Sequence, residues 1–121
     1  MRVYLDNCVF NRPFDDQQQS RIKLETKAVL EIRRRVEIAD IELVWSYIID
    51  VENSRNPLAA RRESIDSWRN LALIEVEPSI KIVSLSLELR NLGLDDLDSL
   101  HIACAIEAKS GYFITTDDGI L

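Results

Sequence analysis

Four acidic residues have the chemistry and the positions of a divalent-cation site. Asp6 directly follows a short apolar run, Glu52 comes six residues after Ser46, Asp98 opens an apolar segment, and Asp117 lies just beyond the last apolar run. Crowded carboxylates raise one another's pKa unless a cation compensates their charge. Acids without a Cys or His ligand favour Mg²⁺ or Mn²⁺ over zinc. Such an ion lowers the pKa of bound water and stabilises charge on a phosphoryl oxygen, which is the chemistry of phosphodiester hydrolysis.

Short apolar strands alternate with helices along the chain, and this alternation predicts an α/β fold with a parallel sheet. Strands are expected at 3–5, 41–45, 71–76 and 112–115, and helices over about 17–37, from 47 through 52, from 57 through 69, around 83–89 and over 97–109. Ser46 and either Asp95 or Asp96 suit helix N-caps, and Gly93 suits a helix end. We expect a loop over 11–16, because Pro13 lacks an amide donor.

Strand carboxyl ends and the N-termini of the helices that follow them share one edge of a parallel sheet. Asp6 and Asp117 follow the first and last expected strands, whereas Asp98 and Glu52 lie near helix starts. The topology therefore predicts that the four acids meet at this edge.

Composition limits the class of protein. The 121 residues, 46% hydrophobic and 30% charged, predict one compact domain over residues 1–121. The net charge of −6 argues against binding nucleic acid through a uniformly basic surface. No apolar run approaches the roughly 20 residues of a membrane helix. Asp6 stands where a secretory signal peptide would have its apolar core, so we expect a cytoplasmic protein. Cys8 and Cys104 are expected to be small reduced thiols.

Together these segments resemble the PIN domain, the fold of VapC-type toxin ribonucleases. The resemblance rests on four motifs in order across nearly the whole chain: Tyr4-Leu5-Asp6, Ser46 with Glu52, the segment 98–103 (DSLHIA), and the segment 113–117 (FITTD).

The resemblance implies a three-layer α/β/α fold whose central parallel sheet has four strands, with five as the alternative. It also implies an acidic pocket of Asp6, Glu52, Asp98 and Asp117 that binds one or two Mg²⁺ or Mn²⁺ ions, and endonucleolytic cleavage of single-stranded RNA. Thr115 would shape the turn that presents Asp117. VapC-type members form homodimers and are inhibited by a small antitoxin protein, so both partners are expected here.

Two features depart from the family pattern. Cys8 stands where many members have Ser or Asn, so a polar contact to Asp6 is either missing or supplied by Asn7. The sequence also ends at Leu121, directly after the fourth expected strand, where members usually continue into a further strand.

Each candidate residue also has an ordinary structural interpretation. Asp6 could be a turn residue, and either Asp117 or Asp118 could hydrogen-bond within a turn. Asp98 could serve a helix N-terminus together with Asp95. The metal interpretation is favoured for all of them, because the four positions converge on one edge.

Other residues are less specific. Glu52 has Asp50 and Glu42 as nearby rivals. His101, the only histidine, is interpreted as a packing residue beside Asp98 rather than as a ligand. The arginines of two helices could guide RNA, but charge on exposed helix faces is usually solvated; they are Arg33, Arg34, Arg35, Arg61, Arg62 and Arg69.

Two other function classes compete with the nuclease. A catalytically inactive PIN-like module would bind RNA or protein, and would not be stabilised by Mn²⁺ if its pocket were degraded. A haloacid-dehalogenase-type phosphatase would use Asp6 as nucleophile, but it requires a second Asp two residues later, where this chain has Cys8.

Overall fold

A four-stranded, all-parallel sheet forms the centre of the protein. The computed structural model describes residues 1–116, and the strand order is β3-β2-β1-β4. The strands are β1 (Arg2–Leu5), β2 (Glu42–Ser46), β3 (Ile74–Val76) and β4 (Tyr112–Ile114). The predicted parallel sheet is confirmed, and each strand overlaps the apolar run that predicted it.

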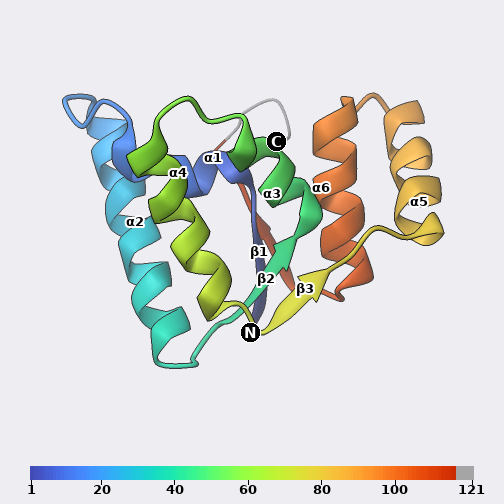
Figure 1. Ribbon diagram of the computed structural model, residues 1–121, viewed down its shortest axis with the longest axis horizontal. Helices are drawn as coiled ribbons and strands as arrows, with labels where there is room; N and C mark the ends of the chain where they lie inside the picture. The colour runs from blue at the N-terminus through green and yellow to red at the C-terminus, as the bar shows by residue number, and fades with distance from the viewer. Residues whose placement is uncertain (117–121) are drawn as a thin grey trace.

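Helices cover both faces of the sheet, which confirms the predicted three-layer α/β/α fold (Figure 1). They are α1 (Asn7–Asn11), η1 (Arg12–Phe14), α2 (Ser20–Glu37), α3 (Tyr47–Ser54), α4 (Ala59–Asp66), η2 (Ser67–Leu71), α5 (Ile80–Asn91) and α6 (Asp96–Glu107). Helices α2 and α4 lie on one side of the sheet, and α5 and α6 lie on the other. None of the helices in residues 1–116 is long and apolar enough to cross a membrane.

The segment between β1 and α2 differs from the prediction. Asn7–Asn11, for which no helix was expected, is helical, and Asp6 is the N-cap of this short helix. Pro13 is tolerated at the start of η1, where an amide donor is not needed. Helix α2 begins at Ser20 instead of near Gln17. The side-chain Nε2 of Gln17 donates to the backbone carbonyls of Arg12 and Asp15, and these hydrogen bonds hold Gln17 outside the helix.

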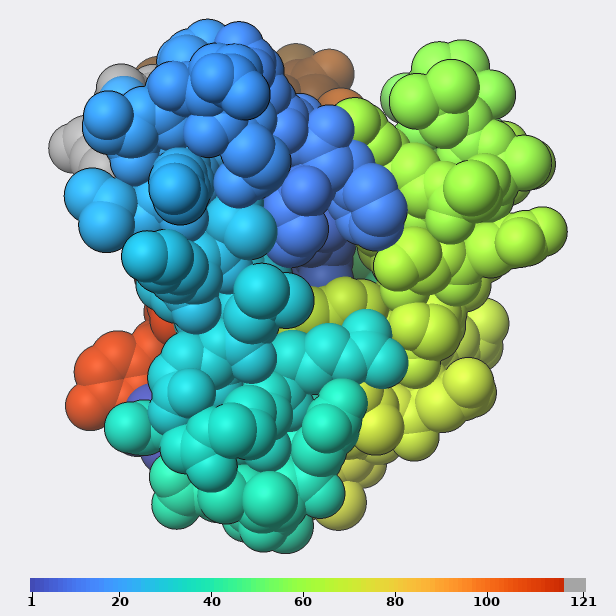
Figure 2. All heavy atoms as spheres, turned by 90° about the vertical axis from the view of Figure 1, so that its left-hand side faces the viewer, coloured from blue at the N-terminus to red at the C-terminus, as the bar shows by residue number. Residues whose placement is uncertain are grey.

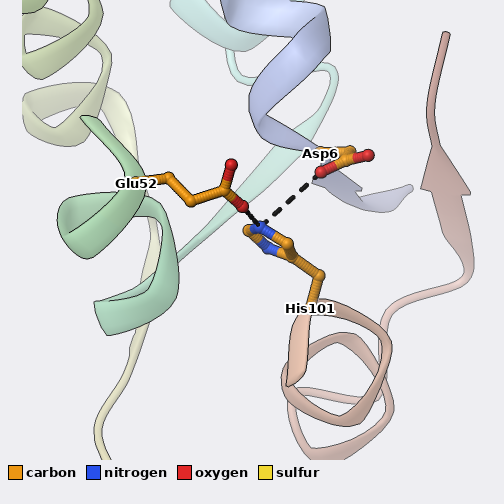
Figure 3. Close-up of side chains that lie close together, drawn as sticks. All are labelled: Asp6, Glu52 and His101. Carbon is orange, nitrogen blue, oxygen red and sulfur yellow. Dashed lines mark hydrogen bonds and ion pairs between the residues drawn. The ribbon is translucent and has the colours of Figure 1, made fainter. Parts of the chain in front are cut away.

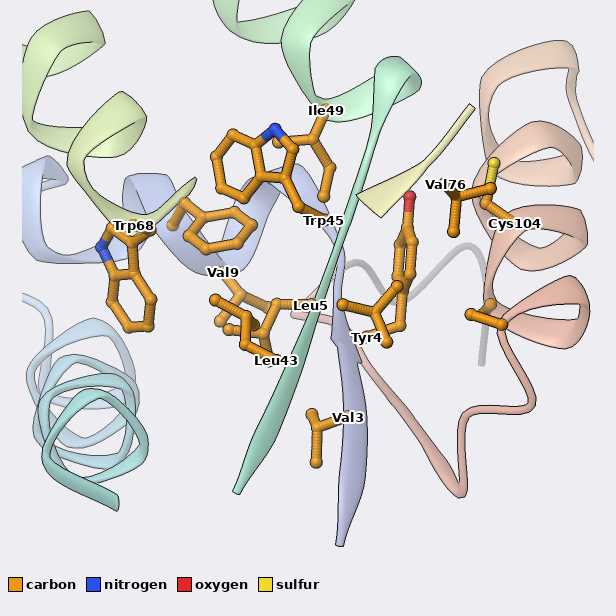
Figure 4. Packing of buried hydrophobic residues seen from close by; sticks show 14 of the residues in the cluster. Val3, Tyr4, Leu5, Val9, Leu43, Trp45, Ile49, Trp68, Val76 and Cys104 are labelled. Atoms are coloured by element: carbon orange, nitrogen blue, oxygen red, sulfur yellow. The ribbon is translucent and has the colours of Figure 1, made fainter. Parts of the chain in front are cut away.

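The core lies on both faces of the sheet, because successive strand residues point to opposite sides. On the side of α2 and α4, Leu5 and Leu43 pack with two tryptophans (Figure 4). The Phe10 ring lies between these tryptophans, with centroids 5.3 Å from Trp45 and 5.2 Å from Trp68. On the opposite side Tyr4 points toward α6 (Figure 4). The sheet is therefore fixed between two apolar layers.

Helices α2 and α4 form an outer face of the molecule (Figure 2). Their arginines are engaged within the protein: Arg33 pairs with Glu37 at 3.1 Å and Arg34 with Glu31 at 2.6 Å. Arg61 reaches Phe14, donating to its backbone carbonyl. These contacts favour the solvated-face interpretation over an RNA-binding surface.

The N-cap of α6 can be tested by substitution. Asp95 is the cap residue, and its Oδ1 accepts a hydrogen bond from the Asp98 amide at 2.8 Å. Asp95→Ala should lower the free energy of unfolding by about 1 kcal/mol, the usual cost of losing such a cap. Asp96→Ala, one residue later and outside the cap, is the matched control in urea denaturation. Equal losses in the two variants would show that the cap does not hold α6.

Candidate metal centre

Three ionisable side chains gather at the carboxyl edge of the sheet. Asp6 comes from the end of β1, Glu52 from α3 and His101 from α6 (Figure 3). One ligand atom from each lies within 4.8 Å of the others. Two of the acids predicted from the sequence therefore do meet, although 46 positions separate them in the chain. The third member of the cluster is His101, for which the sequence had favoured a packing role.

Asp6 is buried, with 6% of its surface exposed, and is held by several donors. The Asn7 amide donates to Oδ1 at 2.7 Å, and the Thr115 hydroxyl donates to Oδ2 at 3.0 Å. The Cys8 thiol also donates to Oδ2, at 3.4 Å. The polar contact that the family pattern places near this acid is thus supplied by the Asn7 backbone and, weakly, by the thiol. Because β1, α1 and the end of β4 all contribute, the carboxylate has a fixed orientation.

Glu52 is placed by the start of α3. Ser46 caps this helix as predicted, its Oγ accepting from the Ile49 amide. The half-buried Glu52 side chain extends toward His101 and is hydrogen-bonded to its Nε2. The two rival acids lie elsewhere: Asp50 accepts from the Trp45 indole at 2.9 Å, and Glu42 pairs with Arg2. The geometry therefore places Glu52, rather than either rival, beside Asp6.

His101 connects the acids to the interior. Its side chain is fully buried, and its Nδ1 lies 2.6 Å from the Tyr4 hydroxyl. Its Nε2 faces Glu52 and lies 3.6 Å from Oδ1 of Asp6. The available sequence signal was its position three residues after Asp98, on the same side of an apolar helix. That signal does not show which groups from other strands and helices face the ring.

The other two predicted acids have different outcomes. Asp98 is half-buried in the first turn of α6, one turn before His101, and is not among the three clustered side chains. Asp117 lies outside the described residues, as does the turn that Thr115 was expected to shape. Their participation in a metal site stays a prediction.

The clustered residues fit a divalent cation. Among residues 1–116, neither Asp6 nor Glu52 forms an ion pair with a Lys or Arg, so their charges lack a permanent basic partner. Burial of carboxylates without a compensating cation is costly. Two carboxylates and an imidazole are ligands for Mg²⁺, Mn²⁺ and other first-row cations. A divalent cation bound here would offset both charges.

Comparisons with known proteins identify the family. The PIN domain family model matches residues 3–121. The chain belongs to the PIN domain family. The fold is also similar to a chain in the crystal structure of VapBC2 from Rickettsia felis bound to a DNA fragment from their promoter. That match has a TM-score of 0.59 and 16% identity, and covers 97% of this chain and 88% of that chain. No curated protein sequence matches. The PIN resemblance inferred from the sequence is confirmed.

The two thiols should be poorly reactive. Burial raises the pKa of Cys8, and the nearby Asp6 charge adds to this effect. Burial also raises the pKa of Cys104, to about 11. Because the thiolate is the nucleophile, both residues should react with iodoacetamide at about pH 8 more slowly than free cysteine. Intact-mass spectrometry measures the rates, with the urea-unfolded chain as control. Alkylation of Cys8 at the unfolded rate would contradict this environment.

Proposed function

We propose that this protein is a divalent-metal-dependent endoribonuclease that hydrolyses phosphodiester bonds of single-stranded RNA. The observation that carries the proposal is the convergence of Asp6 and Glu52 at the carboxyl edge of the sheet, where within residues 1–116 neither forms an ion pair with a Lys or Arg. Membership of the PIN domain family supports it. Mg²⁺ or Mn²⁺ is the proposed cofactor, because both accept carboxylate oxygens.

The proposed site consists of Asp6, Glu52, Asp98 and Asp117. The cation, when bound, lowers the pKa of its water and stabilises charge on the phosphoryl group. Asp6 and Glu52 bind the cation through their carboxylates. The donors from Asn7 and from the end of β4 fix the orientation of Asp6 before the cation arrives. Preorganisation of this kind lets a ligand bind without first being reoriented.

The proposed partners follow from the PIN domain family and from a structural neighbour. One structural neighbour is a chain of VapBC2 from Rickettsia felis, in a crystal structure bound to a DNA fragment from their promoter. We propose that this chain is the toxin of a toxin–antitoxin pair, that it acts in the cytoplasm as a homodimer, and that a small antitoxin protein inhibits it.

A cleavage assay tests the activity. Tag-free protein should cut a fluorescent single-stranded RNA internally when Mg²⁺ or Mn²⁺ is present and should stop when EDTA removes the ion. A DNA strand of the same sequence tests the preference for RNA. Cleavage that persists in EDTA would contradict the metal requirement. RNA binding without cleavage under every metal condition would instead indicate an inactive binding module.

A further inference from the structure

A buried chain of hydrogen bonds ends at the candidate metal centre. It begins at Ser46, whose Oγ lies 2.7 Å from the Tyr4 hydroxyl oxygen. That oxygen lies 2.6 Å from Nδ1 of His101, whose Nε2 is hydrogen-bonded to Glu52. Ser46, Tyr4 and His101 are all nearly or fully buried, so water does not compete for these contacts. The direction of each hydrogen bond must therefore be settled among these few groups.

One direction suits the site without a cation. Each of the two hydroxyl groups, on Ser46 and on Tyr4, carries one hydrogen. If Ser46 donates to Tyr4 and Tyr4 donates to Nδ1 of His101, the imidazole hydrogen lies on Nε2. That hydrogen is then donated to the Glu52 carboxylate. Every donor has an acceptor, and the imidazole N–H satisfies one of the two acids.

The reverse direction suits a site that holds a cation. The Nδ1 hydrogen is donated to the Tyr4 hydroxyl, and Tyr4 donates to Ser46. Ser46 then accepts hydrogen bonds from both the Tyr4 hydroxyl and the Ile49 amide. Nε2 now carries a lone pair directed toward the two carboxylates. Without a cation, lone pairs would face one another there. With a cation, the three groups form one ligand set.

The two directions contain the same number of protons. They differ in which ring nitrogen of His101 carries the imidazole hydrogen, Nε2 or Nδ1, and in the rotation of the two hydroxyl hydrogens. A histidine ligand usually donates its second ring N–H to a neighbouring acceptor, and the Tyr4 oxygen supplies that acceptor here.

We propose that Nε2 of His101 is a nitrogen ligand of the cation bound by Asp6 and Glu52, and that the Ser46–Tyr4 pair is the relay that permits the required tautomer. This inference rests on the metal site of the proposed function and adds a ligand to it. A nitrogen ligand strengthens binding of Mn²⁺ relative to Mg²⁺, because Mg²⁺ favours oxygen ligands.

Electron spin-echo spectroscopy of bound Mn²⁺ tests this coordination directly. His101 is the only histidine in the chain, so tag-free protein has a single imidazole. We expect the coupling of one directly bound ¹⁴N, replaced by a ¹⁵N coupling when histidine is labelled. Bound Mn²⁺ without nitrogen coupling would overturn the proposal. The readout does not involve RNA, so nitrogen coupling without cleavage would reject the nuclease function alone, and cleavage without coupling would reject this inference alone.

Tyr4→Phe tests the relay without removing the ring. It deletes the acceptor for the Nδ1 hydrogen, and loss of such a partner typically weakens metal binding about 10- to 100-fold. Tyr47→Phe is the matched control, because this half-buried tyrosine adjoins Ser46 but lies outside the relay. Isothermal titration with Mn²⁺ should show the loss only for Tyr4→Phe, with both variants folded by circular dichroism. Equal affinity in Tyr4→Phe and the native protein would overturn the role of the relay.

Discussion

Asp6→Asn is expected to abolish RNA cleavage, reducing the rate by at least about 100-fold, while the protein stays folded. Loss of a partner behind a metal ligand already costs 10- to 100-fold in affinity or activity, and loss of a ligand should cost no less. Asn keeps the shape of the side chain and is an equally good N-cap, so α1 should remain in place. Initial rates with single-stranded RNA and Mn²⁺ measure the effect.

A matched substitution separates the metal site from a general loss of charge. The exposed Asp16 also accepts a backbone hydrogen bond, from the Gln18 amide at 3.0 Å, but lies outside the cluster. Asp16→Asn should therefore cleave at the native rate. Native-like cleavage by Asp6→Asn would remove Asp6 from the mechanism, and inactivation of both variants would show that the effect is not specific to the site.

Phe10→Ala is expected to lower the free energy of unfolding by about 3–5 kcal/mol. The ring is 1% exposed and contacts Trp45 and Trp68, so its removal leaves a cavity between two large side chains. A loss of this size is a large part of the 5–15 kcal/mol that stabilises a typical protein. Phe10 lies in α1, and this helix begins directly after Asp6. The variant should therefore also hold the Asp6 carboxylate in a less fixed position. Urea denaturation followed by tryptophan fluorescence measures the change.

Phe14 allows the same Phe→Ala substitution to be compared at the protein surface. It is 40% exposed, and Arg61 lies over its ring at 5.3 Å. Phe14→Ala should cost no more than about 1 kcal/mol, the value of an exposed cation–π contact. If Phe10→Ala were as mild as Phe14→Ala, the aromatic cluster would not be the anchor of α1.

The sequence predicted the strands and most helices because their signals are local. The runs around Val3–Leu5 and Glu42–Trp45 are apolar enough to indicate buried strands. Ser46 marks a helix start, and Gly93, with φ of +104°, follows a helix end as expected. Helix α1 escaped prediction because a five-residue helix has no periodicity, and its stability comes from Phe10 packing against distant residues.

The sequence predicted that Asp6 and Glu52 lie close together, but not that His101 lies beside them, for a related reason. The position of Asp6 could be predicted because it follows the end of β1. The position of Glu52 could be predicted because its helix, α3, follows the end of β2. The placement of the His101 ring depends on Tyr4, 97 positions away, and on which side of α6 faces the sheet edge. A single sequence contains no signal for such a contact. His101 was therefore interpreted by the usual behaviour of a lone histidine.

The most direct test of the metal centre is anomalous diffraction from crystals soaked in Mn²⁺. We predict an anomalous peak between the side chains of Asp6 and Glu52, in contact with an oxygen of each carboxylate. No peak there, at an Mn²⁺ concentration that supports RNA cleavage, would contradict the claim that these two acids hold the catalytic cation.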